Sequence, residues 1–338
     1  MPLSDLPARI VVLCSTAEDR PPHMTEVEAR AEVSYVDARG LAEAVRDAHA
    51  LFLWDFFSSA VRDVWDEVGP LEWIHVAAAG VDKLLFDELA DSDVVVTNAR
   101  GVFDRPIAEY VLMAVLAHAK DGRRSHDLQR QRVWLHRETL TVQGATALIV
   151  GTGAIGRETA RLLRAVGMEV RGAGRTPRDD DLDFGTVVES ASLADHVGWA
   201  DHVVVVAPLT PQTRGLVDRR TLAAMKTTAH LVNVGRGAAV VESDLLEALR
   251  AGELAAATLD VFETEPLPPD SPLWDAPNLT ITPHMSGDVV GWRDALARQF
   301  ADNARRWLDG QPLVNVVDKR LGFVPSASAA AVGSREVR

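Results

Sequence analysis

Short apolar runs alternate with helix-like segments along most of this chain. In the first hundred residues, runs rich in β-branched and aromatic side chains occur at 9–14, 32–37, 50–54, 71–77 and 93–98. Segments with helical spacing lie between them, such as LAEAVRDA at 41–48. This alternation predicts βαβ units, in which helices cover both faces of a parallel sheet.

A second alternating series follows a long helical stretch. Residues 105–134 read as one helix, which Pro106 opens near its first turn. Six further strands are expected at 146–151, 169–174, 202–208, 230–235, 255–262 and 279–283. The pattern therefore predicts two α/β units joined by a long helix. A last helix at 293–308 follows the final strand, and by packing back on the first unit it would make that domain discontinuous.

The bulk composition narrows the class of protein. The chain has 338 residues, with 35 Lys and Arg against 49 Asp and Glu, a net charge of −14. Such an acidic surface argues against nucleic acid or an anionic membrane as the main partner. The single cysteine, Cys14, excludes an intramolecular disulfide and a thiolate-rich metal site, and no metal is expected. Because it lies in the apolar run IVVLC, we expect a buried, inert thiol.

Nothing in the sequence reads as a targeting or spanning segment. No run reaches the roughly 18 apolar residues that a transmembrane helix needs. The first residues lack the basic start and long apolar stretch of a signal peptide, which predicts a cytoplasmic protein. Residues 321–338 are small and polar with little periodicity, and we expect a disordered tail there.

A glycine motif marks the start of the second series. ALIVGTGAIG places Gly151, Gly153 and Gly156 after an apolar strand and before a helix. In this context Gly151 permits a tight turn, Gly153 lets backbone amides approach a pyrophosphate, and Gly156 lets helix and strand pack closely. The positive end of the helix then favours the phosphates. The motif predicts a bound dinucleotide.

The end of the next strand bears on which dinucleotide binds. An acid is expected about 20 residues on if the cofactor is NAD, because it accepts the ribose hydroxyls. Gly174 stands there instead, followed by Arg175, Thr176 and Arg178, which favours the 2′-phosphate of NADP. Four acids follow and would repel the same phosphate unless they are simply a solvated loop: Asp179, Asp180, Asp181 and Asp183.

Three ionisable residues of complementary type follow strands of the second series. Arg236 lies in LVNVGRG, Glu265 in DVFETEPLP and His284 in TPHMSG. Ligands of an open parallel sheet bind beyond the carboxyl ends of its strands, so these residues are expected beside the nicotinamide. Gly235 and Gly237 should let the backbone turn freely and aim the guanidinium at a ligand. Each residue taken alone also fits a solvated loop position.

The three residues suit hydride transfer to a 2-keto acid. A planar, permanently charged guanidinium binds the substrate carboxylate and keto oxygen, while an imidazole donates a proton to the developing alkoxide. A carboxylate partner favours the imidazolium and one ring tautomer. Asp260, at the end of another strand, is either a plain strand-end acid or a second tuning group near the nicotinamide.

With these residues in place, the chain resembles the D-2-hydroxyacid dehydrogenase family. The match runs from about residue 50 to residue 320. It includes AAAGVD (77–82), TNARGVFDRPIAEYVL (97–112), VGTGAIG, APLTPQTRGLVD (207–218), LVNVGRG, LDVFETEPLP and TPHMSG. Glutamate at 265 speaks against formate dehydrogenases, which carry glutamine there, and GAGRTPR is similar to the glyoxylate/hydroxypyruvate reductase branch.

The resemblance implies a Rossmann domain inserted in a flavodoxin-like substrate domain, both doubly wound parallel sheets. The implied divisions are 1–100 and 285–320 for the substrate domain and 101–284 for the NAD(P)-binding domain. It also implies a catalytic triad of Arg236, Glu265 and His284, and a homodimer through the long helix. The substrate carboxylate would bind the backbone of Ala78, Ala79, Gly80 and Val81.

The expected cofactor site extends beyond the glycine motif. NADP is expected over NAD, held by these residues: Gly151, Gly153, Ala154, Ile155, Gly156, Gly174, Arg175, Thr176, Arg178, Ala207, Pro208, Thr213, Val234, Gly235, Arg236, Asp260, His284 and Gly287. Trp54 and Trp292 could line a pocket for an apolar substrate side chain, or serve only in aromatic packing. The alternative to an enzyme is a non-catalytic, nucleotide-sensing binding protein, which need not keep all three triad residues.

Overall fold

The computed structural model describes residues 7–16 and 18–325, which form two compact units. Unit 1 takes in the described residues up to Phe103 and from Val289 onward, and unit 2 is Asp104–Asp288. From the sequence, the domain boundaries were expected between residues 100 and 101 and between residues 284 and 285. Each unit contains one mainly parallel sheet with its own hydrophobic core. The predicted fold class, one α/β domain inserted in another, is confirmed.

Unit 1 is built on a parallel sheet whose strands follow the flavodoxin-like order. In spatial order the strands are β2 (Glu32–Val36), β1 (Arg9–Leu13), β3 (Ala50–Leu53), β4 (Trp73–Val76) and β5 (Val95–Asn98). Its helices are α1 (Thr25–Glu28), α2 (Leu41–Ala44), α3 (Ala60–Asp63), α4 (Asp87–Asp91) and α10 (Trp292–Leu308), with 3₁₀ turns η1 (Val45–Asp47) and η2 (Trp65–Glu67). The central strands are buried along their whole length because both faces are covered.

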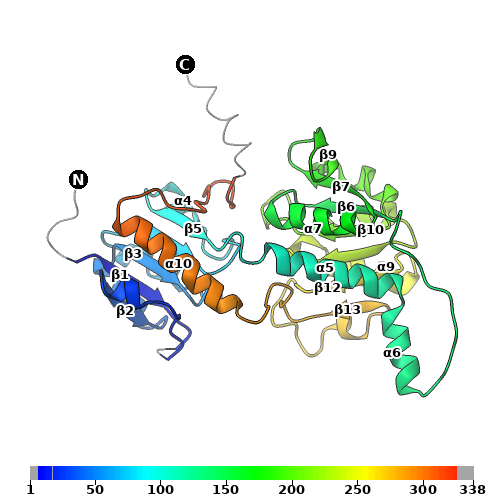
Figure 1. Cartoon of the computed structure of the whole chain (residues 1–338), viewed down its shortest axis with the longest axis horizontal. Coiled ribbons are helices and arrows are strands. Elements are labelled where there is room, and N and C mark those ends of the chain that lie inside the picture. The colour runs from blue at the N-terminus through cyan, green and yellow to red at the C-terminus, as the bar shows by residue number, and fades with distance from the viewer. Residues whose placement is uncertain (1–6, 17, 326–338) are drawn as a thin grey trace. The chain divides into compact units, whose positions relative to one another are not determined.

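Helix α10 returns to this sheet after unit 2 has been completed (Figure 1). Phe300 on α10 stacks on Phe52 of β3, with ring centroids 3.9 Å apart and planes 4° apart. The same ring lies 5.5 Å from Trp73 of β4. Aromatic contacts of this kind add to the area that the helix buries, so the last helix is held by the first strands.

Unit 2 is a Rossmann sheet with one antiparallel edge strand. In spatial order the strands are β13 (Leu279–Ile281), β12 (Ala256–Leu259), β11 (His230–Asn233), β10 (His202–Val205), β6 (Thr146–Val150), β7 (Glu169–Gly174), β9 (Gly185–Glu189) and β8 (Arg178–Asp181). The helices are α5 (Asp104–Ala119), α6 (Gly122–Arg130), α7 (Ala154–Ala165), α8 (Arg219–Ala224) and α9 (Glu242–Ala251), with 3₁₀ turns η3 (Ser190–Asp195), η4 (Val197–Trp199), η5 (Gly237–Ala239) and η6 (Pro272–Asp275).

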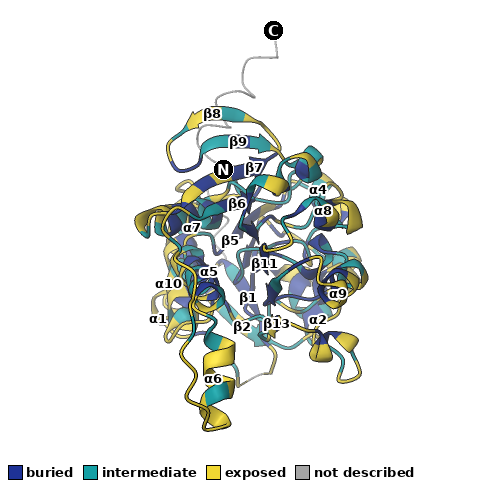
Figure 2. Ribbon diagram, turned by 90° about the vertical axis from the view of Figure 1, so that its right-hand side faces the viewer, coloured by how far each residue is buried: buried dark blue, intermediate teal, exposed yellow. Residues whose placement is uncertain are grey.

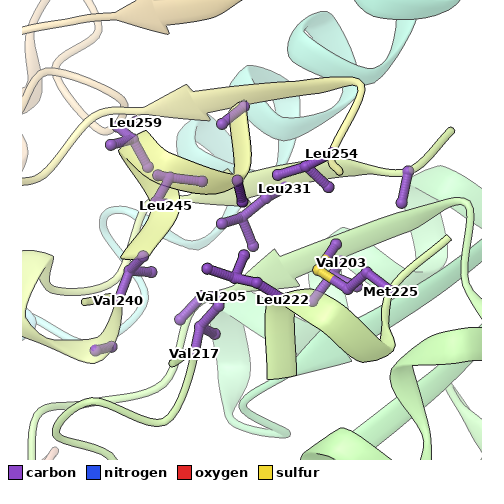
Figure 3. Packing of buried hydrophobic residues seen from close by; sticks show 14 of the residues in the cluster. Val203, Val205, Val217, Leu222, Met225, Leu231, Val240, Leu245, Leu254 and Leu259 are labelled. Atoms are coloured by element: carbon purple, nitrogen blue, oxygen red, sulfur yellow. The ribbon is translucent and has the colours of Figure 1, made fainter. Parts of the chain in front are cut away.

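Small and branched apolar side chains fill the core on one face of this sheet (Figure 3). Val203 and Val205 of β10 and Leu231 of β11 are fully buried, together with Leu222 of α8 and Leu245 of α9. These strands and helices therefore hold the carboxyl ends of β10 and β11 in fixed positions. The loops that follow them start from fixed positions for the same reason.

The structure corrects three expectations from the sequence. Residues 105–134 are not one helix: α5 ends at Ala119 and α6 begins at Gly122, because Asp121 adopts a left-handed conformation with φ 50°. Aspartate before glycine tolerates that conformation and forms turns. Helix α6 has no buried residue and lies at the surface (Figure 2).

The second correction concerns the segment after β7, where the sequence predicted no strand and the structure has the β8–β9 hairpin. The third concerns the tail. Residues 321–325 are ordered in unit 1, where the carbonyl of Phe323 accepts the amide of Asp318 at 3.1 Å. The remainder of the expected tail, 326–338, lies outside the described residues. Cys14 is buried, as predicted. In the described part of the chain, no helix has the length and apolar character needed to cross a membrane.

Candidate active site

The glycine-rich turn between β6 and α7 has room for a ligand at one position only. Gly151 has φ +113°, and a Cβ atom there would lie 2.8 Å from the amide nitrogen of Ala207. A Cβ atom at Gly156 would lie 1.9 Å from the carbonyl oxygen of Gly151. At Gly153 a Cβ atom would meet nothing within 4 Å. Gly151 and Gly156 are therefore required by packing, whereas Gly153 leaves open space at a helix N-terminus.

This turn fits a dinucleotide. The first turn of α7, which includes Ala154 and Ile155, contains no acidic residue, and no side chain caps it. Its amides and partial positive charge are thus available to a pyrophosphate that approaches over Gly153. On the neighbouring loop, Thr213 Oγ1 donates to the carbonyl of Pro208 at 2.7 Å, which braces the segment that follows β10.

The ribose end of the site is defined by Gly174, the last residue of β7. A Cβ atom there would lie 2.9 Å from Thr152 Oγ1 in the glycine-rich turn. A side chain at 174 would therefore collide with the turn that should hold the pyrophosphate. Arg175 and Thr176 follow and are exposed. Arg178 is half-buried and engaged, because its Nε donates to Asp181 Oδ2 at 2.8 Å.

The acidic run after Arg178 is only partly solvated: Asp179 and Asp180 are exposed, whereas Asp181 and Asp183 are paired with arginines. Asp181 and Asp183 have side chains only 5% and 11% exposed, and both accept hydrogen bonds from Arg157 on α7. Asp183 also accepts from Arg161 Nε at 2.7 Å. Burial works against ionisation of both carboxyls, but the hydrogen bonds, first among them those from Arg157, outweigh it and lower the pKa of each. These two charges are neutralised within the protein, so they do not confront a ligand as free carboxylates.

The carboxyl ends of three adjacent strands bring the proposed catalytic residues into one region. Strands β11, β12 and β13 are in parallel register, with Asn233 opposite Leu259 and Leu259 opposite Ile281. Arg236 follows the first of these strands, and Glu265 and His284 follow the second and third. The sheet therefore fixes where each of these loops begins.

Arg236 is positioned by close packing rather than by flexible glycines. Neither Gly235 nor Gly237 has a positive φ. A Cβ atom at 235 would lie 2.9 Å from the carbonyl oxygen of Ala207, and one at 237 would lie 1.8 Å from the carbonyl carbon of Phe262. The expectation that these glycines supply conformational freedom was therefore wrong. They are small because the backbone passes directly against two neighbouring segments, which fixes the Arg236 turn.

Asn233, which the sequence did not single out, closes that turn. Its side chain is fully buried at the end of β11. Its Nδ2 donates to the carbonyl of Arg236 at 3.0 Å, and its Oδ1 accepts the amide of Gly235 at 3.1 Å. A buried amide that satisfies both backbone groups makes the turn rigid. The signal was an asparagine ending an otherwise apolar strand.

Glu265 and His284 form a direct pair. His284 Nδ1 lies 2.7 Å from Glu265 Oε2, with the side chains 36% and 25% exposed. Glu265 Oε1 accepts the backbone amide of Phe262 at 3.0 Å, which orients the carboxylate. When Nδ1 donates to the carboxylate, Nε2 is the ring nitrogen that can exchange a proton with a ligand. The pair thus has the geometry of an oriented acid–base imidazole.

Asp260 anchors the loop that carries His284. Its carboxylate is fully buried and accepts the amides of Met285 at 2.9 Å and Ser286 at 2.8 Å. Its carbonyl accepts the amide of His284 at 2.7 Å. His284 has φ 51°, a left-handed conformation that is costly for a non-glycine residue, and these bonds hold it. Asp260 is therefore more than a plain strand-end acid, whereas a contact with the cofactor stays a prediction.

Two further residues support the same loop, and sequence reasoning missed both. Thr282 Oγ1 donates to Asp260 Oδ1 at 2.5 Å, and the Tyr110 hydroxyl on α5 lies 2.5 Å from Thr282 Oγ1. Burial is the main cause that raises the pKa of Tyr110. A tyrosine on the apolar face of α5 carried no separate sequence signal, because its partner is 172 residues away. Gly287, the last expected cofactor residue, is buried in this loop.

The expected carboxylate-binding loop lies in unit 1, after β4. Ala78 and Ala79 are held through their carbonyls, which accept the amide of Ala99 at 2.9 Å and Asn98 Nδ2 at 2.5 Å. Within the described residues, the amides of Ala79, Gly80 and Val81 donate to no protein acceptor. A braced loop with several unused amides is suited to an anion.

Trp54 and Trp292, the two tryptophans expected to line a substrate pocket, are engaged in packing with aromatic and cationic side chains. Trp54 is 3% exposed, and the Arg293 guanidinium lies 4.4 Å from its ring centroid. Trp292 packs against Phe56 and Phe103, each with ring centroids 6.1 Å away. The structure therefore shows the packing role for both rings, and a substrate contact stays a prediction.

Comparisons with known proteins agree with this arrangement. The family model for the NAD binding domain of D-isomer specific 2-hydroxyacid dehydrogenases matches residues 112–286. Glyoxylate/hydroxypyruvate reductase A of Serratia proteamaculans is 35% identical over 266 residues, 75% of this chain and 82% of that protein. (S)-sulfolactate dehydrogenase of Chromohalobacter salexigens is 36% identical over 231 residues, 68% of this chain and 75% of that protein.

A solved structure shows the same fold. The D-isomer specific 2-hydroxyacid dehydrogenase from Xanthobacter autotrophicus, in complex with NADPH and MES, has a TM-score of 0.79 to this chain at 31% identity. The match covers 94% of this chain and 100% of that one. The alternative of a non-catalytic nucleotide sensor receives no support, since each of these relatives is named as a reductase or a dehydrogenase.

Proposed function

Because the chain belongs to the D-isomer specific 2-hydroxyacid dehydrogenase family, we propose that it reduces short 2-keto acids with NADPH as the preferred reductant. The reaction class follows from the family: an NAD(P)-dependent oxidoreductase that interconverts a 2-keto acid and a D-2-hydroxy acid. The observation that carries the proposal is the 2.7 Å contact between His284 Nδ1 and Glu265, in loops that follow β13 and β12 of the same parallel sheet whose strand β6 leads into the glycine-rich turn.

The catalytic roles proposed for unit 2 follow from its geometry. A bound nicotinamide supplies the hydride. Arg236 binds the substrate carboxylate and keto oxygen through its guanidinium, which is held at a turn that cannot shift. His284 donates a proton from Nε2 to the keto oxygen as negative charge develops there, and Glu265 stabilises the imidazolium and keeps the ring in one orientation.

The loop of Ala78, Ala79, Gly80 and Val81 is proposed to bind the substrate carboxylate through its unused amides. Glyoxylate and hydroxypyruvate are the substrates we favour, on the relationship to a glyoxylate/hydroxypyruvate reductase. A larger or sulfonated keto acid is the second candidate, because a sulfolactate dehydrogenase is related to a similar degree. A panel of glyoxylate, hydroxypyruvate, pyruvate and 3-sulfopyruvate, followed by loss of NADPH absorbance, tests the choice. No turnover of any member would refute the proposal.

The preference for NADPH rests on the end of β7. Gly174 leaves no acid to accept the ribose hydroxyls, and Arg175 and Arg178 supply positive charge beside it. A 2′-phosphate carries about two charges, so one or two arginine contacts can give about a ten- to a thousand-fold preference. The comparison of kcat/KM for NADPH and NADH in wild type and Arg175→Ala measures it. Equal or better use of NADH by wild type would refute this part of the proposal.

We also propose a homodimer formed through α5 and the segment after α6. Apolar side chains are exposed there: Met113, Val133, Trp134, Leu135 and Leu140. Trp134 is completely exposed, which is unusual for so large an apolar side chain. Light scattering should give the mass of two chains, and Trp134→Glu should shift it towards one; a monomeric wild type would contradict the proposal.

A cytoplasmic location, which suits a chain with one unpaired thiol, can be checked by cell fractionation.

A further inference from the structure

We infer that Asp181 is a positioning residue for nucleotide choice: it holds Arg178 in place, and through Arg178 it strengthens binding of the adenosine 2′-phosphate. The inference rests on the proposed preference for NADPH. It concerns a residue that reaches the proposed nucleotide site only through Arg178 and whose charge alone would repel a phosphate.

The Asp181 carboxylate is the centre of a hydrogen-bond network. Its Oδ2 accepts from Arg178 Nε at 2.8 Å, and its two oxygens accept from Arg157 at 2.9 and 3.0 Å. Its Oδ1 also accepts the amides of Asp183 at 3.0 Å and Phe184 at 3.3 Å. Two guanidinium groups therefore share one almost buried carboxylate, and the two amides keep that carboxylate from rotating.

This network joins the turn after β7 to the helix that follows the glycine-rich turn. Arg157 lies on α7, and Arg178 is the first residue of β8. Phe184, fully buried in the turn between β8 and β9, packs against Arg157 and against β7, where a Cβ atom at Gly172 would lie 3.0 Å from its ring. Residues 175–177 are thus bounded by β7 on one side and by the Asp181 network on the other.

Holding Arg178 matters because arginine loses much conformational freedom when it binds a ligand. Of its five N–H groups, Nε and one on Nη2 are used by Asp181, and one on Nη1 donates to the carbonyl of Thr176 at 3.2 Å. Two remain for a phosphate at the end of β7. With the side chain already ordered, binding no longer has to immobilise it, a gain of about three- to ten-fold in affinity.

Asp183 provides a matched control within the same network. It has a similarly buried carboxylate and is paired with Arg157 and Arg161, but it makes no contact with Arg178 among the described residues. Asp183→Asn therefore removes an equivalent charge from the same hairpin and the same helix. Any effect common to both variants reports on the hairpin, and an effect confined to Asp181→Asn reports on Arg178.

The test measures binding by calorimetry to the full chain, with two probes that differ only in the 2′-phosphate: adenosine 2′,5′-bisphosphate and adenosine 5′-monophosphate. In Asp181→Asn the bisphosphate should bind about three- to ten-fold more weakly, while the monophosphate changes by less than about two-fold. Asp183→Asn should leave both within about two-fold. In an Arg178→Ala background, Asp181→Asn should have no further effect. In turnover, Asp181→Asn should raise the KM for NADPH and leave kcat and the KM for NADH unchanged.

The outcomes separate this inference from the proposed cofactor preference. If wild type does not discriminate between the probes, the NADPH preference is wrong and the inference falls with it. If wild type discriminates and Asp181→Asn keeps the same ratio, only the inference is overturned. Tighter binding of the bisphosphate to Asp181→Asn would also overturn it, since Asp181 would then compete with the phosphate. Should Asp181→Asn fail to fold, an unchanged ratio in Arg178→Ala overturns the inference by itself.

Discussion

Mildly acidic pH should destabilise unit 2, because two of its buried histidines are protonated when it unfolds. His202 and His230 are the first residues of β10 and β11 and stand directly opposite each other in the sheet. Both are buried, and within the described residues the Nδ1 atom of each has no hydrogen-bond partner. His118, in the last turn of α5, stacks on His230 with ring centroids 4.6 Å apart. A proton added at either of these Nδ1 atoms would find no hydrogen-bond acceptor. The resulting charge would also lie against two neighbouring imidazole rings.

The sign of the effect follows from the pKa values. Burial, and secondly the charge of His118, lower the pKa of His202 from 6.5 to about 4, against a smaller opposing effect of Asp201. Burial, followed by His118 and His202, holds the pKa of His230 well below 6.5. Below pH 6.5 these histidines are therefore protonated in the unfolded chain but stay neutral in the folded unit. Stability is present in full above that pH and falls as the pH approaches 4.

The magnitude is large for a single domain. At pH 5 an unfolded pKa of 6.5 and a folded pKa of about 4 for His202 correspond to about 2 kcal/mol of lost stability. Burial keeps the pKa of His230 below its unfolded value as well, so its protonation on unfolding lowers stability in the same direction. The loss from His202 alone is a sizeable part of the roughly 5–15 kcal/mol that keeps a domain folded, and protonation of His230 adds to it.

Hydrogen exchange of peptides that cover β10 and β11 isolates this unit, because the free energy of opening is read from its own amides. From pH 7 to pH 5, wild type should lose about 2 kcal/mol more opening free energy than His202→Leu. His136→Leu, which removes an exposed histidine, should show the full loss. If His202→Leu loses as much as wild type, protonation of the buried cluster does not govern acid stability.

Three further predictions concern the proposed site. Arg236→Ala should lower kcat/KM for any accepted keto acid by several kcal/mol of transition-state energy, about a thousand-fold, with NADPH binding retained; activity within about tenfold of wild type would exclude the role. Glu265→Gln should lower kcat for reduction by about ten-fold or more, because the His284 ring loses the carboxylate that orients it; a kcat equal to that of wild type would contradict this. Gly237→Ala should lower stability by about 3 kcal/mol or more, since its methyl group would overlap the backbone of Phe262, whereas Gly153→Ala should not; equal melting temperatures would contradict the packing argument.

Much of the fold could be predicted because its strands are buried on both faces. The strands at β1, β3, β6, β10 and β11 are short, continuous apolar runs, and such runs require a parallel sheet with helices on either side. The glycine-rich turn could also be predicted from the sequence. Gly151 and Gly156 are required by contacts with residues nearby in the chain or at the end of the adjacent strand. The candidate acid–base pair was found for a related reason: each residue stands just beyond a recognisable strand.

What the sequence alone determined, then, is the order of the elements, the place of the nucleotide turn and the residue types at the strand ends, because all of these depend on local pattern. Only the tertiary structure decided how the polar residues are paired. From the sequence, Asp181 was one of four acids that either repel a phosphate or form a solvated loop, yet it is held by two arginines, one of them 24 residues earlier. Gly237 was expected to let the backbone turn freely, yet its size is dictated by Phe262, 25 residues later. Contacts between segments distant in the chain have no periodicity to reveal them, and they alone determine whether a charge is neutralised or a turn is rigid.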